Sequence, residues 1–486
     1  MQLIDFPAEI LTAVLRRTLR YPDYGRRLER NLPLVAVCRR LRYIALPIVY
    51  EEAYVDIFDE NSTWRDEYNM RLSPVESALS TQNEQRVRDD WVAISNVDHI
   101  ASMGYIGLVQ HMRIVLEASF GHAVGLRYAV RYLSTVASEW PTVKRLEICI
   151  NGPTHDPRAS IHDLYSEDWD DPEDAVEFAG LALALKGMMP NVHGLDFADC
   201  RSLATPTLGE QLTQQYHQQL RMLCFMVSTD ELDNADAAPA AQDGHSLKLD
   251  FPLLHRARIC CVSGPCPVLV SAVFPRSMGF LCIEVTAPVW QSISHMELPV
   301  AQQLKLDITS QADDDIRLPL SFNQLLTNSN QCGKVMLCAN YHEPAACLPS
   351  VAFTGLTGLL VEVHISADMV LDIIGKLPRL VTLVVIYSTS EPIQADITIP
   401  GPGQCHPVKL LSTKLQTLSY GQQDIREQLH ANIELYQYFL LKLPSLRRFG
   451  TGGERARMLV PFVEAYQEWY PHLAAVDFSR IDYQRI

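Results

Sequence analysis

One phrase recurs along this chain and constrains its fold: a helix end, a proline, an apolar residue and then a strand. In the clearest copy, Pro141 ends the apolar run that closes at Trp140, because proline cannot continue a helix. Residues 145–150 then alternate apolar and polar side chains, which is typical of a half-buried strand. Further copies and weaker strand patterns begin at Met189, Phe251, Leu281, Leu304, Leu359, Leu377, Leu443 and Tyr470. This recurrence predicts a repeating unit of helix and strand.

Two copies also fit the template L-x-x-L-x-L-x-x-N/C. The residues at the template positions are Val143, Leu146, Ile148 and Asn151 in one copy, and Val192, Leu195, Phe197 and Cys200 in the next. On these residues the chain resembles the leucine-rich-repeat family. The resemblance implies an irregular α/β solenoid over residues 109–486, with parallel strands on its concave face and helices outside. An ordinary α/β sheet of parallel strands is the alternative interpretation.

Composition excludes several classes of protein. The chain has 486 residues and a formal net charge of −16, which argues against a nucleic-acid partner, since that would require a basic surface. No apolar run reaches the roughly 18 residues of a membrane span. Acidic Asp5 and Glu9 lie where a signal peptide would be apolar, and the scattered cysteines are typical of reduced thiols. We therefore expect a cytoplasmic or nuclear protein that binds neither membrane nor nucleic acid.

The first 50 residues have a purely helical pattern. Pro7 and Glu9 suit the first turn of a helix, and its apolar stripe consists of Ile10, Leu11, Val14 and Leu15. A second helix is predicted to start near Asn31 and to stop at Pro47. Its apolar stripe consists of Leu34, Val37, Cys38, Leu41, Ile44 and Ala45. Two short amphipathic helices need a further surface to cover both apolar faces.

Residues 6–11, 34–45 and 47–50 are similar to the F-box, in their Phe-Pro-Ala-Glu-Ile-Leu start, their Val-Cys-Arg-Arg-Leu stretch and their closing tyrosine. The resemblance implies an F-box-like helical domain over residues 1–55 that docks a Skp-type adaptor. The segment between the two helices is longer than in the family and rich in arginine. The implied adaptor-binding residues are Phe6, Pro7, Ile10, Leu11, Val14, Leu34, Val37, Cys38 and Leu41. The alternative is a helical cap for the repeats.

Residues 56–108 are interpreted as a connecting loop and one helix. Insertions into the repeats are expected near 155–174, 229–246 and 388–407. The first is acidic but lacks the residue order of a calcium-binding loop, which favours a solvated loop. A strand over 111–116 and helices over 126–139, 424–442 and 454–469 are also predicted.

The sequence lacks the common motifs of nucleotide-binding, catalytic and metal-binding sites. No phosphate-binding loop, dinucleotide-binding fingerprint, H-E-x-x-H or G-x-S-x-G occurs. Cys260, Cys261 and Cys266 lack the paired C-x-x-C spacing of a zinc site, and Cys405 beside His406 does not define a catalytic pair. We predict no catalytic residues, no metal site and no cofactor.

The combined resemblances imply a non-enzymatic substrate receptor of an SCF-type ubiquitin ligase, joined through the adaptor to a cullin scaffold. A target protein would bind side chains on the strand face turned away from the core. These candidates are Arg145, Glu147, Asp196, Arg256, Arg258, Glu284, Lys305, Asp307, Glu362, His364 and Asp477. Arg256 and Arg258, two residues apart, are expected to grip an acidic or phosphorylated segment together. Two alternatives remain, a leucine-rich-repeat scaffold without a ligase and an α/β enzyme with a site built from scattered residues.

Overall fold

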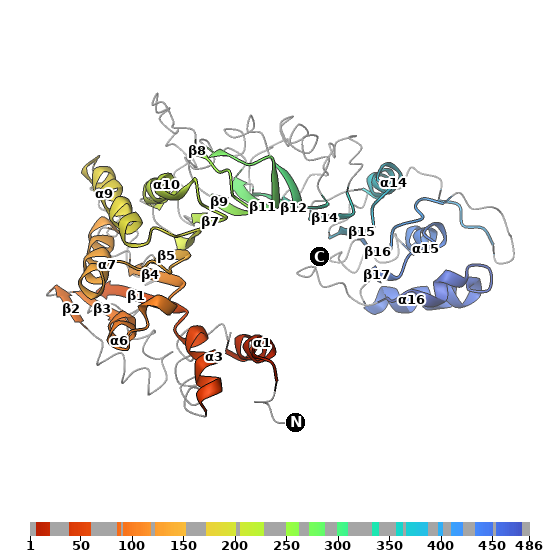
Figure 1. Ribbon diagram of the computed structural model, residues 1–486. Helices are drawn as coiled ribbons and strands as arrows, with labels where there is room; N and C mark the ends of the chain where they lie inside the picture. Colours follow the sequence, from red (N-terminus) through yellow and green to blue (C-terminus); the bar gives the residue numbers. More distant parts are fainter. Residues whose placement is uncertain are drawn as a thin grey trace. The chain divides into compact units, whose positions relative to one another are not determined.

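The computed structural model forms two compact α/β units, each built on a mostly parallel sheet with helices (Figure 1). Unit 1 contains residues 1–254 and 266–272, and unit 2 contains 255–265 and 273–486. The described ranges are 6–19, 38–59, 85–88, 91–117, 122–151, 172–200, 205–227, 249–261, 272–286, 299–309, 333–339, 356–362, 366–386, 397–401, 410–420, 433–450 and 453–478.

Unit 1 carries a sheet whose strands run in the order β2-β3-β1-β4-β5-β6-β7. The strands are β1 (Glu52–Asp59), β2 (Gln85–Arg88), β3 (Trp91–Ser95), β4 (His111–Glu117), β5 (Arg145–Asn151), β6 (Gly194–Cys200) and β7 (Met222–Val227). Strand β3 pairs antiparallel with β1 and β2, whereas β1 and β4 to β7 are parallel. The helices are α1 (Ala8–Leu19), α3 (Arg39–Val49), α6 (Val97–Ser102), η3 (Ile106–Leu108), α7 (His122–Val136), α9 (Pro172–Met188) and α10 (Thr205–Tyr216).

Unit 2 carries parallel strands in the order β9-β11-β12-β13-β14-β15-β16-β17. They are β9 (Arg256–Cys261), β11 (Ser277–Thr286), β12 (Val300–Thr309), β13 (Lys334–Ala339), β14 (Gly358–Glu362), β15 (Thr382–Val385), β16 (Thr417–Tyr420) and β17 (Arg448–Gly450). The helices are α14 (Ala367–Lys376), α15 (Ile433–Lys442), α16 (Gly453–Tyr466) and η6 (Pro471–Ala475). Two short strands, β8 (Leu249–Asp250) and β10 (Ala272–Val273), lie outside these two sets.

Apolar side chains at matching positions form continuous buried rows across the strands. In unit 1 one such row consists of Ala53, Met112, Leu146, Leu195 and Leu223. In unit 2 the equivalent row consists of Ala257, Leu281, Leu304, Val335, Leu359, Leu383, Leu418 and Phe449. Each fully buried side chain of this size contributes roughly 1.5–3 kcal/mol. Because the rows run unbroken between neighbours, each strand depends on the next for its core.

The sequence predicted most of the parallel strands, and the structure confirms those at Arg145–Asn151, Gly194–Cys200 and Arg256–Cys261, and also the later ones in β11, β12, β14, β15 and β17. Strands β1, β2, β3, β7, β13 and β16 were not predicted, so the interpretation of residues 56–108 as a loop and one helix is incomplete. The predicted strand over 111–116 is β4, and the helix predicted over 126–139 is α7, which ends at Val136.

The extent predicted for the second N-terminal helix differs from that of α3. Cys38 has extended backbone and caps α3, its sulfur accepting a hydrogen bond from the Leu41 amide at 3.4 Å, so a helix from near residue 31 cannot run through it. Pro47 lies inside the last turn, and α3 continues to Val49 because proline's fixed φ is helical and only one hydrogen bond is lost there.

Several expectations fall outside the described residues. These are the start of the second helix, the acidic loop up to residue 171, the insertion at 229–246, most of 388–407, and residues 424–432 of a predicted helix. The described parts of the two closing helices, α15 and α16, lie where the sequence predicted them.

Two helical glycines offer a test of the packing between α10 and β7. A Cβ at Gly209 would overlap Cε2 of the buried Phe225 ring, whereas a Cβ at the exposed Gly180 would meet nothing within 4 Å. We expect Gly209→Ala to cost about 1–3 kcal/mol by overpacking and to lower the thermal midpoint by roughly 2–10 °C. Gly180→Ala, the matched control, should raise stability by about 0.5–1 kcal/mol. Equal midpoints for the two variants would show that Phe225 moves aside without cost.

Candidate functional site

Most of the side chains that the sequence singled out for target binding gather in two separate charge clusters, one in each unit. Successive residues of a strand point to opposite faces, so the positions between the buried apolar rows share the other face. In unit 1 this face aligns Arg113, Glu147 and Asp196 on neighbouring strands. In unit 2 it aligns Glu284 with Asp307. Both clusters therefore result from the parallel register of the strands.

The unit 1 cluster is centred on Glu147. Its carboxylate lies 3.1 Å from Nε2 of His111, 3.5 Å from Nε of Arg113 and 3.6 Å from the guanidinium of Arg145. Arg145 also pairs with Asp196 on the next strand. Burial alone would raise the pKa of Glu147, but His111, Arg113 and Arg145 together hold that pKa below its usual value.

The two carboxylates of the unit 1 cluster are buried, whereas Arg145 is half-exposed. The side chains of Glu147 and Asp196 are only 8% and 9% exposed. The prediction that these two carboxylates project toward a target is therefore wrong, because neighbouring cations cover them. A buried carboxylate needs such partners, since an unpaired charge is costly to remove from water. The cluster serves to join β4, β5 and β6.

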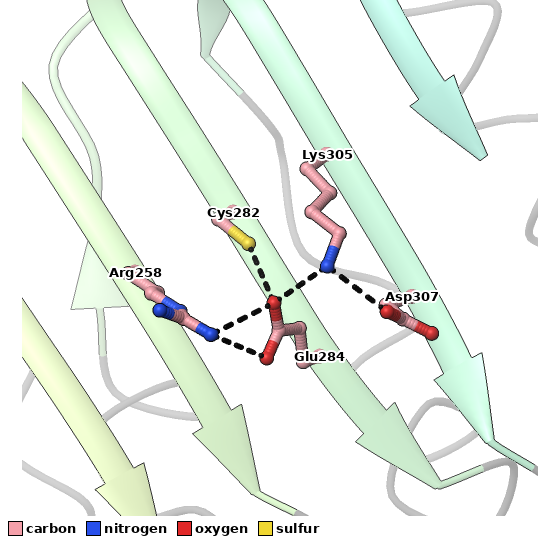
Figure 2. Close-up of polar contacts among 5 residues, drawn as sticks. All are labelled: Arg258, Cys282, Glu284, Lys305 and Asp307. Carbon is pink, nitrogen blue, oxygen red and sulfur yellow. Dashed lines mark hydrogen bonds and ion pairs between the residues drawn. The ribbon is translucent and has the colours of Figure 1, made fainter. Parts of the chain in front are cut away.

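The unit 2 cluster is centred on Glu284, as Figure 2 shows. The guanidinium of Arg258 lies 3.3 and 3.1 Å from the two carboxylate oxygens, and Nζ of Lys305 lies 2.8 Å from Oε1. The thiol of Cys282 donates to the same Oε1 at 3.3 Å. Lys305 also lies 3.0 Å from Asp307. Two cations and two carboxylates from three adjacent strands thus form one network.

The electrostatics of the unit 2 cluster favour structure over catalysis. Burial raises the pKa of Glu284, but hydrogen bonds and charge from Lys305, with further hydrogen bonds from Cys282 and Arg258, outweigh it and set that pKa to about 2. Burial and the Glu284 carboxylate raise the pKa of the Cys260 thiol to about 12, and they raise the pKa of Cys282 as well. Both thiols are protonated at neutral pH, and the thiol form is not a nucleophile.

The carboxylates of the unit 2 cluster are more exposed than those of unit 1, with Glu284 at 15% and Asp307 at 25%. The arginines do not differ, since Arg258 is 44% exposed and Arg145 of unit 1 is 43% exposed. Arg256 is also exposed, and its guanidinium carbon lies 5.5 Å from the centroid of the Phe280 ring. The two arginines share a face as predicted, and Arg258 is held by Glu284. That they grip a ligand together stays a prediction.

The remaining target-binding candidates belong to neither charge cluster. Glu362 is the last residue of β14, opposite Cys338, and its side chain lies outside the described residues, as does the whole of His364. Asp477 is exposed and forms a parallel bridge with Arg448 beside β17.

The adaptor-binding candidates lie in the helix pair α1 and α3, and the structure divides them into two groups. Leu11 and Leu41 are buried in a cluster with Leu15, Ile44 and Ala45, so the expectation that they are available to a partner is wrong. Phe6 and Cys38 pack against this cluster, and the exposed Pro7 accepts a hydrogen bond from the Leu11 amide. Leu34 and Val37 lie outside the described residues.

Three large apolar side chains of the helix pair remain exposed. Ile10 is 46% exposed, Val14 is 42% exposed and Tyr43 is 82% exposed. Ile10 and Val14 are four residues apart on α1, so they occupy the same face of that helix. Sequence reasoning missed Tyr43, which lies outside the predicted apolar stripe.

Sequence reasoning also missed other residues beside the two clusters, because it did not assign every strand residue to one face of the sheet. His111 and Arg113 are on a strand that was predicted, and the alternation of apolar and polar residues along it would have placed them beside Glu147. Phe280 gave no sequence signal, because an aromatic residue on the polar face resembles a core residue.

A scan of protein-family models found no match to this chain, and a search of curated proteins found none either. Within the described ranges, no helix has both the length and the apolar character to cross a membrane. The same ranges contain no group of three or more His, Cys, Asp or Glu residues that could hold a metal ion.

The depressed pKa of Glu284 predicts a specific pH dependence of stability. A carboxylate whose pKa falls from 4.5 to about 2 on folding stabilises the protein above pH 4.5, and the contribution is lost as pH falls toward about 2. Glu284→Gln should therefore lower the free energy of unfolding by roughly 2–3 kcal/mol at pH 7 and by progressively less below pH 4.5. Urea unfolding across this range measures both effects.

Glu464→Gln, which makes the same change at an exposed position of α16, is the control and should shift stability by less than about 0.5 kcal/mol. A Glu284→Gln deficit that stays constant from pH 7 to pH 3 would contradict the assigned role of the carboxylate.

Proposed function

We propose that this protein is a non-enzymatic substrate receptor of an SCF-type ubiquitin ligase, which docks a Skp-type adaptor through its N-terminal helix pair. The observation that carries the proposal is the exposed apolar surface of Ile10, Val14 and Tyr43 on helices whose own core is already filled. The similarity of residues 6–11 and 34–50 to the F-box supports the same conclusion.

The helix pair has the physical character of a docking element. Five buried residues hold α1 and α3 together, and Arg40 donates a 2.8 Å hydrogen bond to the Phe6 carbonyl, so the pair does not need its exposed side chains for its own core. Burying apolar surface in an interface contributes about 25 cal/mol per Å². Aromatic anchors such as Tyr43 commonly dominate interfaces in which a helix fills a groove.

The connection between the helix pair and the sheet of unit 1 is short and well bonded. Only Tyr50 and Glu51 separate α3 from β1. The hydroxyl of Tyr50 lies 3.2 Å from Nε2 of His99, and its ring centroid lies 4.8 Å from that of Tyr105. The carbonyl of Glu51 accepts hydrogen bonds from the amides of Gln110 and His111. An adaptor bound to α1 and α3 would therefore be held at a fixed position relative to β1 and β4.

The parallel strands supply the proposed second function, which is to hold a target protein. We propose that they form a leucine-rich-repeat solenoid, supported by the continuous buried rows and by the template residues Leu146, Ile148, Leu195 and Phe197, all buried. The cullin scaffold would join through the adaptor, and the target would bind the polar strand face. The charge network of unit 2 suits this role better than that of unit 1, because its carboxylates are more exposed.

The adaptor proposal is tested by Ile10→Asp combined with Val14→Asp. Both side chains are exposed, so the change should leave the core intact while placing two charges in the interface, and we expect Skp-type adaptor binding to fall by more than roughly tenfold. Isothermal titration or co-purification with the adaptor measures the loss. The control is Leu183→Asp at an exposed apolar position of α9, which should bind normally.

Changing Leu11 would not be informative, because that side chain is buried and its loss would unfold the helix pair. Unchanged adaptor binding by the Ile10 and Val14 double variant, with helix content intact by circular dichroism, would refute the F-box assignment and leave the interaction scaffold as the function.

A further inference from the structure

The segment that leads from α6 into β4, residues 103–110, differs in charge from the turns that precede β5 and β7. No charged residue occurs from Ile100 to Gln110. The turns before β5 and β7, by contrast, carry the exposed cations Lys144 and Arg221. We name residues 103–110 the uncharged loop.

The uncharged loop presents apolar side chains to solvent. Met103 is 45% exposed. Three further apolar side chains of the loop are half-buried, those of Tyr105, Ile106 and Leu108. A single exposed apolar side chain is common on protein surfaces, whereas a contiguous group of them marks a site of interaction. The unbranched thioether side chain of methionine adapts its shape to a partner, which suits such a site.

Hydrogen bonds fix the backbone of the uncharged loop. The amides of Gly104 and Tyr105 donate to carbonyls of the last turn of α6, at 2.9 Å each. This arrangement requires a left-handed residue after the helix, and Gly104 supplies it with a φ of 72°. Further along, the Ile106 carbonyl accepts a 3.2 Å hydrogen bond from the Thr142 hydroxyl. A loop that is ordered in advance loses little conformational entropy when a partner binds it.

The parallel register places the uncharged loop beside the end of α3. Strands β1 and β4 are parallel, and Glu52 pairs with His111, so both strands begin at the same edge of the sheet. Helix α3 precedes β1 and the uncharged loop precedes β4, and the two therefore lie side by side. The ring centroids of Tyr50, after α3, and Tyr105, in the loop, are 4.8 Å apart.

Helix α6, which carries the uncharged loop, is held between β1 and α7. The side chain of Asn96 accepts a hydrogen bond from the Tyr54 amide at 2.9 Å and donates one to the Glu52 carbonyl at 3.1 Å. Asp98 accepts a hydrogen bond from the Tyr132 hydroxyl on α7. The loop therefore keeps a fixed position relative to β1, the strand that follows the helix pair.

We propose that the uncharged loop is a second contact surface for the adaptor, continuous with the one on the helix pair. Apolar side chains extend along α3 toward the loop, since Pro47 is exposed and Leu46 and Val49 are half-buried. The loop is also uncharged, so it matches the apolar character of Ile10 and the other exposed residues of the helix pair. The proposal rests on the proposed function, whose docking surface it enlarges.

The test is isothermal titration of the full chain with a Skp-type adaptor. Met103→Glu places a charge in the contact and should weaken binding by roughly fivefold or more, whereas Met103→Leu keeps the contact apolar and should bind within about twofold. The matched control is Leu253→Glu, which makes the same kind of change at a 52% exposed apolar residue in the turn before β9. We expect this control to bind within about twofold.

Hydroxyl-radical labelling gives a second readout that needs no substitution. Met103 and Trp469 are exposed to the same extent, 45% and 46%, so both should be oxidised in the chain alone. The adaptor should slow labelling of Met103 by roughly fivefold and leave Trp469 unchanged. Equal labelling of Met103 with and without bound adaptor would overturn the proposal, as would equal loss of binding in Met103→Glu and Leu253→Glu.

The Ile10 and Val14 double variant separates this inference from the proposed function. Loss of binding in that variant together with normal binding by Met103→Glu would refute the uncharged loop alone. Loss of binding in Met103→Glu together with normal binding by the double variant would refute the F-box assignment and retain the loop as a contact surface. Failure of the unaltered chain to bind the adaptor would refute both.

Discussion

Parallel pairing in register is the constraint on which the rest of this protein depends. The carbonyl before one strand accepts hydrogen bonds from two successive amides at the start of the next, as Lys144 does from His193 and Gly194 and as Val381 does from Gln416 and Thr417. This pattern recurs in both units and fixes each strand against its neighbour. Because side chains alternate between faces, one register aligns the buried apolar rows and the charged rows at the same time.

Alignment of the charges has opposite consequences in the two units. In unit 1 it places Glu147 among three basic side chains, and burial makes these pairs necessary to the fold. In unit 2 the carboxylates of the network around Glu284 are less deeply buried. Similar strand sequences therefore yield a cluster with buried carboxylates in one unit and a cluster with more exposed carboxylates in the other.

The N-terminal helix pair follows a different principle, because its helices are too short to be stable alone and share a small core. Leu11 and Leu41 lie inside that core, whereas Ile10, Val14 and Tyr43 lie outside it. Its proposed docking role thus depends on residues adjacent to the stripe that stabilises it. The contacts of Tyr50 with His99 and of the Glu51 carbonyl with Gln110 and His111 connect the proposed adaptor site with the sheet that begins the proposed target-binding region.

The sequence by itself determined the α/β class, most of the parallel strands and the first helix, because periodicity and the recurring proline are local signals. It did not reveal β1, in which buried Ala53, Val55 and Ile57 alternate, or the short apolar β3, because so short a run does not distinguish a strand from a helix or loop without its pairing partner, nor did it reveal the end of α3 beyond Pro47. Only the tertiary structure decided which candidates are accessible: Leu11, Glu147 and Asp196 are buried, and Arg258 is held by Glu284. Accessibility depends on neighbouring strands and helices that are distant in the chain, so no local pattern records it.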